Sequence, residues 1–434
     1  MKLAVPIMLA SLSQTLMSLF DIAMVGQLGA AAVAAVGLGG MLTYSVSAFL
    51  NSIQAGTQTV IARREGDGRH HEIATTVKTI MLFSLLVGSI AGLVVIQLAD
   101  SIFPAINDDP DVVGIGISYL KWRNISLGPV MAGYVFYAFY NGISQPRIHL
   151  IASVIANSLN VLLNYCLIFG RFGFPELGAP GAGLATAIAS IVAFAIYAGF
   201  TRMNSIKTRY KGIWLGPMEW PVLRKVLDIS MPAGVQNFGV LVGFAFFMII
   251  MGWVSTVALA ATEIVFNILS FSFMPAMGFL YAAQTLVSEN MGRNDFKAAE
   301  DLVAAATKLC MLLMGAMGVI FMVAPRLILR IFTPVDEIIT AGAFPLVILG
   351  AVQFFDAIGM VHLGALRGAG DNGYPAKMDL ALMWGFFVPA TFVSAITFTM
   401  GINGGWLALA IYIISFAYLA RRRFQAGQWK LIIV

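Results

Sequence analysis

Twelve long apolar runs dominate this chain and restrict what it can fold into. A helix needs about 20 apolar residues to cross the hydrocarbon core of a bilayer, and clusters of charge, proline or glycine separate each run from the next. Strands of a membrane barrel would instead alternate polar and apolar residues over about ten positions. The runs predict membrane-spanning helices at residues 3–27, 33–62, 73–98, 112–142, 147–170, 180–200, 228–253, 257–288, 299–324, 338–366, 375–400 and 403–420.

The composition excludes a soluble catalytic domain. The chain is 59% hydrophobic and 11% charged, whereas soluble domains run at about 45–50% and about 25%. Neither a phosphate-binding G-x-x-x-x-G-K-[ST] loop nor a nucleophile–base or metal-type cluster occurs in the sequence. We therefore expect neither an enzyme nor a bound cofactor.

The basic residues predict how the chain is oriented. With the N-terminus inside, about 20 Lys and Arg residues fall in cytoplasmic turns and tails and about five fall outside, as the positive-inside rule requires. The bias predicts that the chain lies in a plasma or bacterial inner membrane with both termini on the cytoplasmic side. It also accounts for the net charge of +5 without a nucleic-acid partner.

The two halves of the chain resemble each other. A gapless shift of 226 residues lays Pro6 on Pro232, Gly142 on Gly368, and Gln58-Thr59 on Gln284-Thr285. Six spans per half is an even number, so both halves enter the membrane in the same orientation, related by an axis along the membrane normal. We expect an N-lobe over 1–200, a cytoplasmic connector over 201–226 and a C-lobe over 227–434, with a cleft between the lobes.

Four carboxylates lie within or near predicted spans: Asp21, Glu263, Asp356 and Asp379. A charge at mid-membrane costs about 2.5–3.5 kcal/mol on insertion scales, and such residues usually mark ion or proton sites. We interpret Asp21 and Asp356 in this way and leave Glu263 open between an ion site and a packing role. Asp379 lies beside Lys377 near a span end, which favours a structural role.

Three asparagines share one face of the fifth span. Asn157, Asn160 and Asn164 recur at i, i+3 and i+7, and Thr186 on the sixth span can add a hydroxyl. Amide oxygens can bind Na⁺, or the amides can hydrogen-bond a carboxylate that gains and loses a proton. The alternative is polar packing between helices, worth about 0.6 kcal/mol per hydrogen bond.

Aromatic and flexible side chains are candidates for the cleft lining. Tyr137, Tyr140 and Met274 can stack on flat cationic ligands, and Gln284 can add a polar contact. Packing and lipid contact are the alternative roles for such residues.

As a set, these motifs resemble the multidrug and toxic compound extrusion (MATE) transporter family of the bacterial type. The resemblance rests on the following segments: Val5-Pro6, Ser13-Gln14-Thr15, Asp21 with Met24-Val25-Gly26, Asn160 to Asn164 before Ile168-Phe169-Gly170, Gly181-Ala182-Gly183, and Asp356 before Leu366-Arg367-Gly368-Ala369-Gly370-Asp371.

The resemblance implies twelve helices in two six-helix lobes and export of cationic or amphipathic compounds against inward H⁺ or Na⁺. It assigns Asp21, Asn160 and Thr186 to an N-lobe ion site and Asp356 to the C-lobe. Two positions depart from the pattern, because a fifth-span position acidic in many members is Asn164 and a seventh-span glutamate of one branch is replaced by Val240.

We interpret the chain as a secondary antiporter that acts by alternating access of its lobes, with a small-molecule substrate, H⁺ or Na⁺ as coupling ion, and a monomeric state. A Na⁺ would bind among Asp21, Asn160, Asn164 and Thr186. The main alternative function is a flippase for lipid-linked or amphipathic intermediates. A basic central cleft would suit such cargo, whereas the mid-membrane charges here are acidic.

Overall fold

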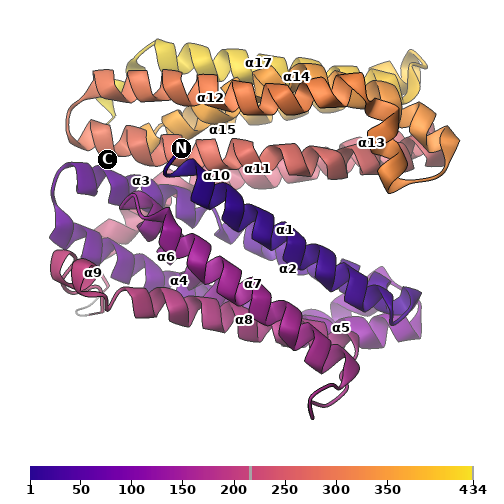
Figure 1. The fold of residues 1–434 in the computed structure, drawn as a ribbon, viewed down its shortest axis with the longest axis horizontal. Helices are drawn as coiled ribbons and strands as arrows, with labels where there is room; N and C mark the ends of the chain where they lie inside the picture. Colours follow the sequence, from indigo (N-terminus) through magenta and orange to yellow (C-terminus); the bar gives the residue numbers. More distant parts are fainter. Residues whose placement is uncertain (215–217, 433–434) are drawn as a thin grey trace. The chain divides into compact units, whose positions relative to one another are not determined.

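The computed structural model describes residues 1–214 and 218–432, with every side chain except that of Phe49. Within this part of the chain the regular elements are all helical (Figure 1). Eleven helices among the described residues are long and apolar enough to cross a membrane. The predicted all-α membrane fold is therefore confirmed.

The helices of the first half are α1 (Ala4–Gly26), α2 (Ala30–Leu50), α3 (Ile53–Gly66), α4 (His70–Ile106), α5 (Pro110–Asn124), α6 (Leu127–Gly142), α7 (Pro146–Phe169), α8 (Ala179–Phe200) and α9 (Asn204–Arg209). Those of the second half are α10 (Trp220–Val254), α11 (Thr256–Gly292), α12 (Phe296–Val323), α13 (Pro325–Phe332), α14 (Asp336–Ala369), α15 (Gly373–Leu382), η1 (Met383–Phe387), α16 (Val388–Phe392), η2 (Val393–Thr397), α17 (Gly401–Gln425) and η3 (Gln428–Leu431).

The predicted span at 112–142 is interrupted, which explains why eleven helices rather than twelve are long enough. It divides into α5 and α6, of 15 and 16 residues, at Ile125 and Ser126. Just before the break, Asn124 donates from its side-chain amide to the Leu120 carbonyl (2.8 Å) and to Thr43 Oγ1 (3.1 Å). Such bonds compete with the helical backbone ladder, so the expectation of one continuous helix is wrong here.

The predicted span at 375–400 is continuous but irregular. Two π-helical turns, η1 and η2, flank the short α16 that contains Pro389. Proline lacks a backbone donor and clashes with the preceding turn of a regular helix. The wider turns on either side adjust the backbone around it.

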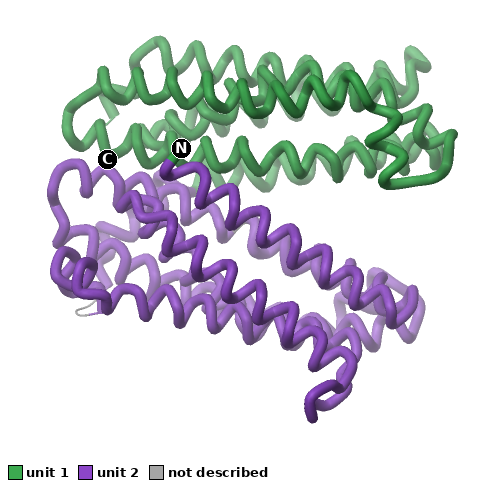
Figure 2. The backbone as a smooth tube through the Cα atoms, viewed as in Figure 1, with its two compact units in different colours: residues 1, 231–434 green, residues 2–230 purple. Residues whose placement is uncertain are grey.

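The chain divides into two compact units, which Figure 2 shows in separate colours: unit 2 comprises residues 2–230 and unit 1 comprises residue 1 and residues 231–434. Within unit 2, α7 packs against α1 and α8, and α4 packs against α6. Within unit 1, α14 packs against α11, α12 and α17. Unit 1 also holds an aromatic core around Phe247, Phe387 and Trp406.

Both units contain the same turn at positions 226 residues apart. After α6, Ser144 takes a left-handed φ of 59° and its N–H donates to Asn141 O (3.0 Å). After α14, Gly370 takes φ 88° and its N–H donates to Arg367 O (3.0 Å). Left-handed residues of this kind close helix ends. The backbone therefore repeats in the register that the sequence predicts.

A close helix contact repeats as well. A Cβ added to Gly142 would lie 2.8 Å from Ile61 Cγ2 and 3.3 Å from the Gln58 carbonyl, and one added to Gly368 would overlap the Gln284 carbonyl. Gly142 and Gly368 are equivalent in the register, as are Gln58 and Gln284. Glycine allows the backbones to approach at this point.

Candidate functional site

Three helices of unit 2 bring the predicted ion-site residues together. Asp21 lies on α1, Asn160 and Asn164 lie on α7, and Thr186 lies on α8. Asn160 and Asn164 are fully buried, and Asp21 is half-buried. We call these four residues the Asp21 cluster.

Asp21 is the centre of this cluster. Asn164 donates from Nδ2 to Asp21 Oδ1 (2.5 Å). One terminal atom of the Asn160 amide lies 2.9 Å from the same Asp21 oxygen, and its other terminal atom lies 3.1 Å from Thr186 Oγ1. Thr186 itself donates to the Ala182 carbonyl (2.9 Å). The groups that hydrogen-bond the carboxylate are thus uncharged.

The Asn160 amide can satisfy either charge state of Asp21. With its nitrogen toward Asp21 it donates to the ionised carboxylate, and its oxygen faces the Thr186 hydroxyl. With its oxygen toward Asp21 the two oxygens lie 2.9 Å apart, and a proton or a cation must lie between them. Because an amide presents both a donor and an acceptor, a half-turn of one side chain accommodates both states.

Two residues of α5 beside the cluster were not among the predicted site residues. Arg123 and Tyr119 both interact electrostatically with Asp21, and Tyr119 is buried. They are four residues apart, so they share one helical face. That spacing is the signal in the sequence that could have indicated them. Nearby, Asn157 donates to Ser13 Oγ (2.9 Å) and so joins α7 to α1.

The two candidate acids of unit 1 lie apart from such a network. Asp356 is half-buried on α14, and Glu263 is exposed on α11. In the portion of the chain that the structure describes, neither side chain forms a hydrogen bond or ion pair. Tyr412 and Cys310 lie within electrostatic range of Asp356.

The proposed cleft residues occupy different environments. Tyr140 is fully buried inside unit 2, where its hydroxyl donates to Tyr197 O (2.7 Å). Tyr137 is half-buried and packs edge-on against the His149 ring at 4.3 Å. In unit 1, Met274 is half-buried and Gln284 is fully buried. Their role in binding a ligand stays a prediction.

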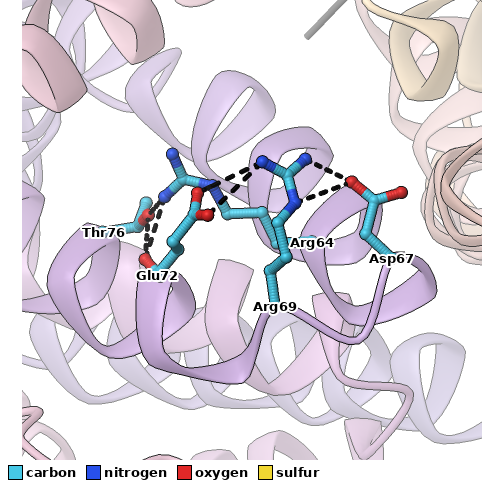
Figure 3. A network of polar contacts seen from close by, with 5 residues as sticks. All are labelled: Arg64, Asp67, Arg69, Glu72 and Thr76. Carbon is cyan, nitrogen blue, oxygen red and sulfur yellow. Dashed lines mark hydrogen bonds and ion pairs between the residues drawn. The ribbon is translucent and has the colours of Figure 1, made fainter.

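Charged residues crowd the turn between α3 and α4 (Figure 3). Arg69 lies between Asp67 and Glu72, with its Nε 3.0 Å from Asp67 Oδ2 and its Nη1 3.3 Å from Glu72 Oε2. Arg64 pairs with Glu72 (3.2 Å) and also donates to Thr76. Burial lowers the pKa of Arg64, whereas the hydrogen bond to Asp67 raises that of Arg69. These charges therefore hold the turn together.

The predicted connector is joined to the same turn. Glu65 accepts from Arg209 (2.5 Å) and from the Tyr210 hydroxyl (2.9 Å), and His70 lies 3.3 Å from it. Residues 215–217 of the predicted connector lie outside the described residues. The basic residue Arg209 thus has a partner within unit 2.

Comparisons with known proteins agree with this architecture. The MatE family model matches residues 6–166 and 232–393, two segments whose starts differ by the same 226 residues as the internal repeat. The chain is 31% identical to the probable multidrug resistance protein NorM of Thermotoga maritima, over 99% of this chain and 92% of that protein. It is 26% identical to the multidrug resistance protein PmpM of Pseudomonas aeruginosa, over 92% of this chain and 83% of that protein.

Solved structures share the fold. A MOP superfamily transporter from Pyrococcus furiosus matches with a TM-score of 0.90 at 19% identity, over 99% of this chain and 96% of that one. The eukaryotic MATE transporter AtDTX14 matches with a TM-score of 0.84 at 16% identity, over 99% and 95% of the two chains. The chain therefore belongs to the MatE family, and it is a multidrug and toxic compound extrusion transporter, not an enzyme.

Proposed function

We propose that the protein exports cationic or amphipathic compounds in exchange for inward protons, by alternating access of two lobes, and that Asp21 carries the coupling proton. One observation supports this most directly. Asp21 has two amide partners from α7, and one of them can serve both the ionised and the protonated carboxyl group.

The donors that face Asp21 favour H⁺ over Na⁺. Asn164 directs its nitrogen toward the carboxylate, and Thr186 uses its hydrogen to donate to Ala182 O. Hard cations instead require several oxygen ligands. Na⁺ is the second candidate, since Asp21, Asn160 and Thr186 offer three oxygens within one cluster.

The substrate class and the membrane setting belong to the same proposal. A mid-membrane carboxylate attracts a cation, which supports cationic or amphipathic compounds as cargo. The excess of Lys and Arg in one set of turns supports cytoplasmic termini in a cell membrane. We propose that each monomer transports independently.

Transport of ethidium in proteoliposomes tests the proposal. Proton and sodium gradients are imposed separately, and ethidium movement is followed by fluorescence. We expect a proton gradient alone to drive transport, and protein-free liposomes to show none. Transport that needs a sodium gradient would replace H⁺ by Na⁺. Movement of lipid-linked or anionic cargo alone would replace the export of cations by the flippase function.

A further inference from the structure

A second buried carboxylate network lies in unit 1. Asp379 on α15 is 5% exposed, and each of its oxygens accepts one hydrogen bond. Gln236 on α10 donates to Oδ2 (2.8 Å), and the Tyr412 hydroxyl on α17 donates to Oδ1 (2.5 Å). Arg367 on α14 in turn donates to Gln236 Oε1 (3.1 Å). We call these four residues the Asp379 cluster.

Two glycines on α10 position this network. A Cβ on Gly239 would overlap the Leu380 side chain, and one on Gly243 would overlap Met383. Small residues four apart on a membrane helix let a neighbouring helix approach closely. Gln236 lies one turn before Gly239 on the same face, so this close approach brings its amide to Asp379.

Asp379, Gln236 and Tyr412 lie on the three helices that are equivalent, in the repeat, to the helices of the Asp21 cluster. A shift of 226 residues takes α1, α7 and α8 onto α10, the α15–η2 segment and α17. Tyr412 then falls on Thr186, so each network has a hydroxyl at the same register position. The separation from Asp21 to Asn164 and from Gln236 to Asp379 is 143 residues in both cases.

The two networks differ in which helix supplies the acid. In unit 2 the acid is on the first helix of the repeat and the amides are on the fifth, whereas in unit 1 the first helix supplies the amide and the fifth supplies Asp379. Gln236 lies nearer the start of its helix than the residue equivalent to Asp21, and Asp379 lies nearer the start of its helix than the residue equivalent to Asn160. At the rise of an α-helix these two offsets are about 10–16 Å. The Asp379 cluster is also distinct from Asp356.

The direct partners of Asp379 are compatible with both of its charge states. The Tyr412 hydroxyl can donate to the carboxylate or accept from the protonated acid. Gln236 keeps its nitrogen toward Oδ2 in both states, because Arg367 donates to the amide oxygen. No cationic side chain in the described ranges 1–214 and 218–432 forms an ion pair with Asp379. Asp371 in the same unit differs, because Arg423 pairs with it directly at 2.8 Å.

The polar, charged and titratable groups around Asp379 come from five helices. Tyr412 on α17 contacts it, Arg367 on α14 is one amide away, and α10 contributes Gln236 and Asn237. Asp356 on α14 lies within electrostatic range of Tyr412, and Tyr281 on α11 within that of Arg367. Lys377 lies two residues before Asp379 on α15.

We propose that Asp379 binds and releases a proton during transport and is a second coupling site, held by Gln236 and Tyr412. This inference rests on the proposed export function. One O–H bond forms when the carboxylate takes up a proton, and the same bond breaks when it releases it. When Arg367 is charged, proton uptake by Asp379 changes the net charge of the Asp379 cluster from zero to +1. A proton on Asp379 and a cationic substrate nearby therefore oppose each other.

Counting the protons released when ethidium binds tests the proposal. The purified full-length protein is placed in weakly buffered solution with a pH-indicator dye, and wild type is compared with Asp21→Asn, Asp379→Asn and the double variant. We expect each single variant to lose part of the release and the double variant to lose all of it. Asp371→Asn is the matched control, a buried acid of the same unit, and should release as many protons as wild type.

Several results would overturn the second site. The second site would be contradicted if Asp379→Asn released as many protons as the wild type. It would also be contradicted if Asp21→Asn alone abolished the proton release. Ethidium export driven by sodium without any proton release would remove the Asp379 proposal and leave export intact. Failure to export ethidium would remove the proposed function instead.

Infrared difference spectra between acidic and alkaline buffer test Asp379 without any transported compound. The carboxylic acid C=O band should lose one component in Asp379→Asn and regain it in Asp379→Glu. Tyr412→Phe should keep the component and move the pH at which it appears. An unchanged band in folded Asp379→Asn would contradict the proposal. If that variant does not fold, an unchanged pH profile in Tyr412→Phe would contradict it.

Discussion

The Asp21 cluster of unit 2 and Asp379 of unit 1 with its direct partners Gln236 and Tyr412 occupy the same three helix positions of the repeat, yet the two sites differ in the charges around the acid. In the Asp21 cluster the partners are uncharged, and Arg123 acts on Asp21 without pairing with it. In the Asp379 cluster, Arg367 is hydrogen-bonded into the network through Gln236. The backbone scaffold is therefore conserved between the halves, whereas the placement of acid and base is not.

This difference predicts how the two clusters respond to a cation. Deprotonation leaves a net negative charge on the Asp21 cluster but a neutral Asp379 cluster. An uncompensated charge in a low-dielectric interior acts strongly on its surroundings. We therefore assign the larger share of coupling to Asp21.

The largest effect is expected from Asp21→Asn. The variant keeps the shape of the side chain but fixes its charge at zero, so the site can no longer exchange a proton. Ethidium efflux driven by a proton gradient should fall to a small fraction of the wild-type rate, and the remaining efflux should be coupled through Asp379. Thermal unfolding of the purified variant should match that of the wild type. Wild-type efflux by this variant would remove the distinction between the clusters.

Asp356→Asn should have a smaller effect. Asp356 is half-buried and forms no hydrogen bond or ion pair with the described residues, and its equivalent in the other half is Val130. We expect partial loss of ethidium transport or a narrower substrate range, measured as initial rates for several cations. If rates, substrate range and coupling stoichiometry all stay at the wild-type level, Asp356 has only a structural role.

The sequence predicted some of these features better than others, for physical reasons. Asn157, Asn160 and Asn164 stood out because helical periodicity is local and visible in the sequence. The Asp379 cluster joins four helices, and its Gln236–Asp379 contact spans 143 residues, so no local pattern signals it. The neighbouring Lys377 made Asp379 look like an interfacial residue.

The breaks in the helices were hidden for a related reason. The run at 112–142 does contain polar residues around the junction at Ile125 and Ser126, namely Lys121, Arg123 and Asn124, but the apolar residues on both sides favour a single span. Hydropathy also does not register a side chain that competes for a backbone carbonyl. Asn124 does so through its bond to Leu120 O. Apolar content thus located the span, while its backbone geometry depends on individual hydrogen bonds.

The close glycine contact that occurs in both halves should tolerate an added methyl group less well in unit 1 than in unit 2. Gly368→Ala should destabilise the protein by about 1–3 kcal/mol, because the new Cβ would overlap the backbone carbonyl of Gln284. Gly142→Ala should cost less, since its nearest obstacle is the Ile61 side chain. Thermal unfolding in detergent measures both.

Gly133→Ala is the control, because a Cβ there meets open space. Equal destabilisation by Gly142→Ala and Gly368→Ala would show that the two contacts are not differentiated.

The smallest expected effect comes from the repeated turn. Ser144 holds a left-handed backbone conformation, with φ 59°, at the position where the other half has Gly370, with φ 88°. A side chain disfavours this region by roughly 1–2 kcal/mol, whereas glycine enters it freely.

Ser144→Gly should therefore stabilise the protein slightly, by about 0.5–1 kcal/mol once the added freedom of the unfolded chain is subtracted. Gly370→Ser should destabilise it by a similar or larger amount. Both effects appear as opposite shifts of the unfolding midpoint measured in the same detergent. A loss of stability in Ser144→Gly would mean that contacts of the serine side chain outweigh the backbone strain. The equivalence of the two turns would then be limited to the path of the main chain.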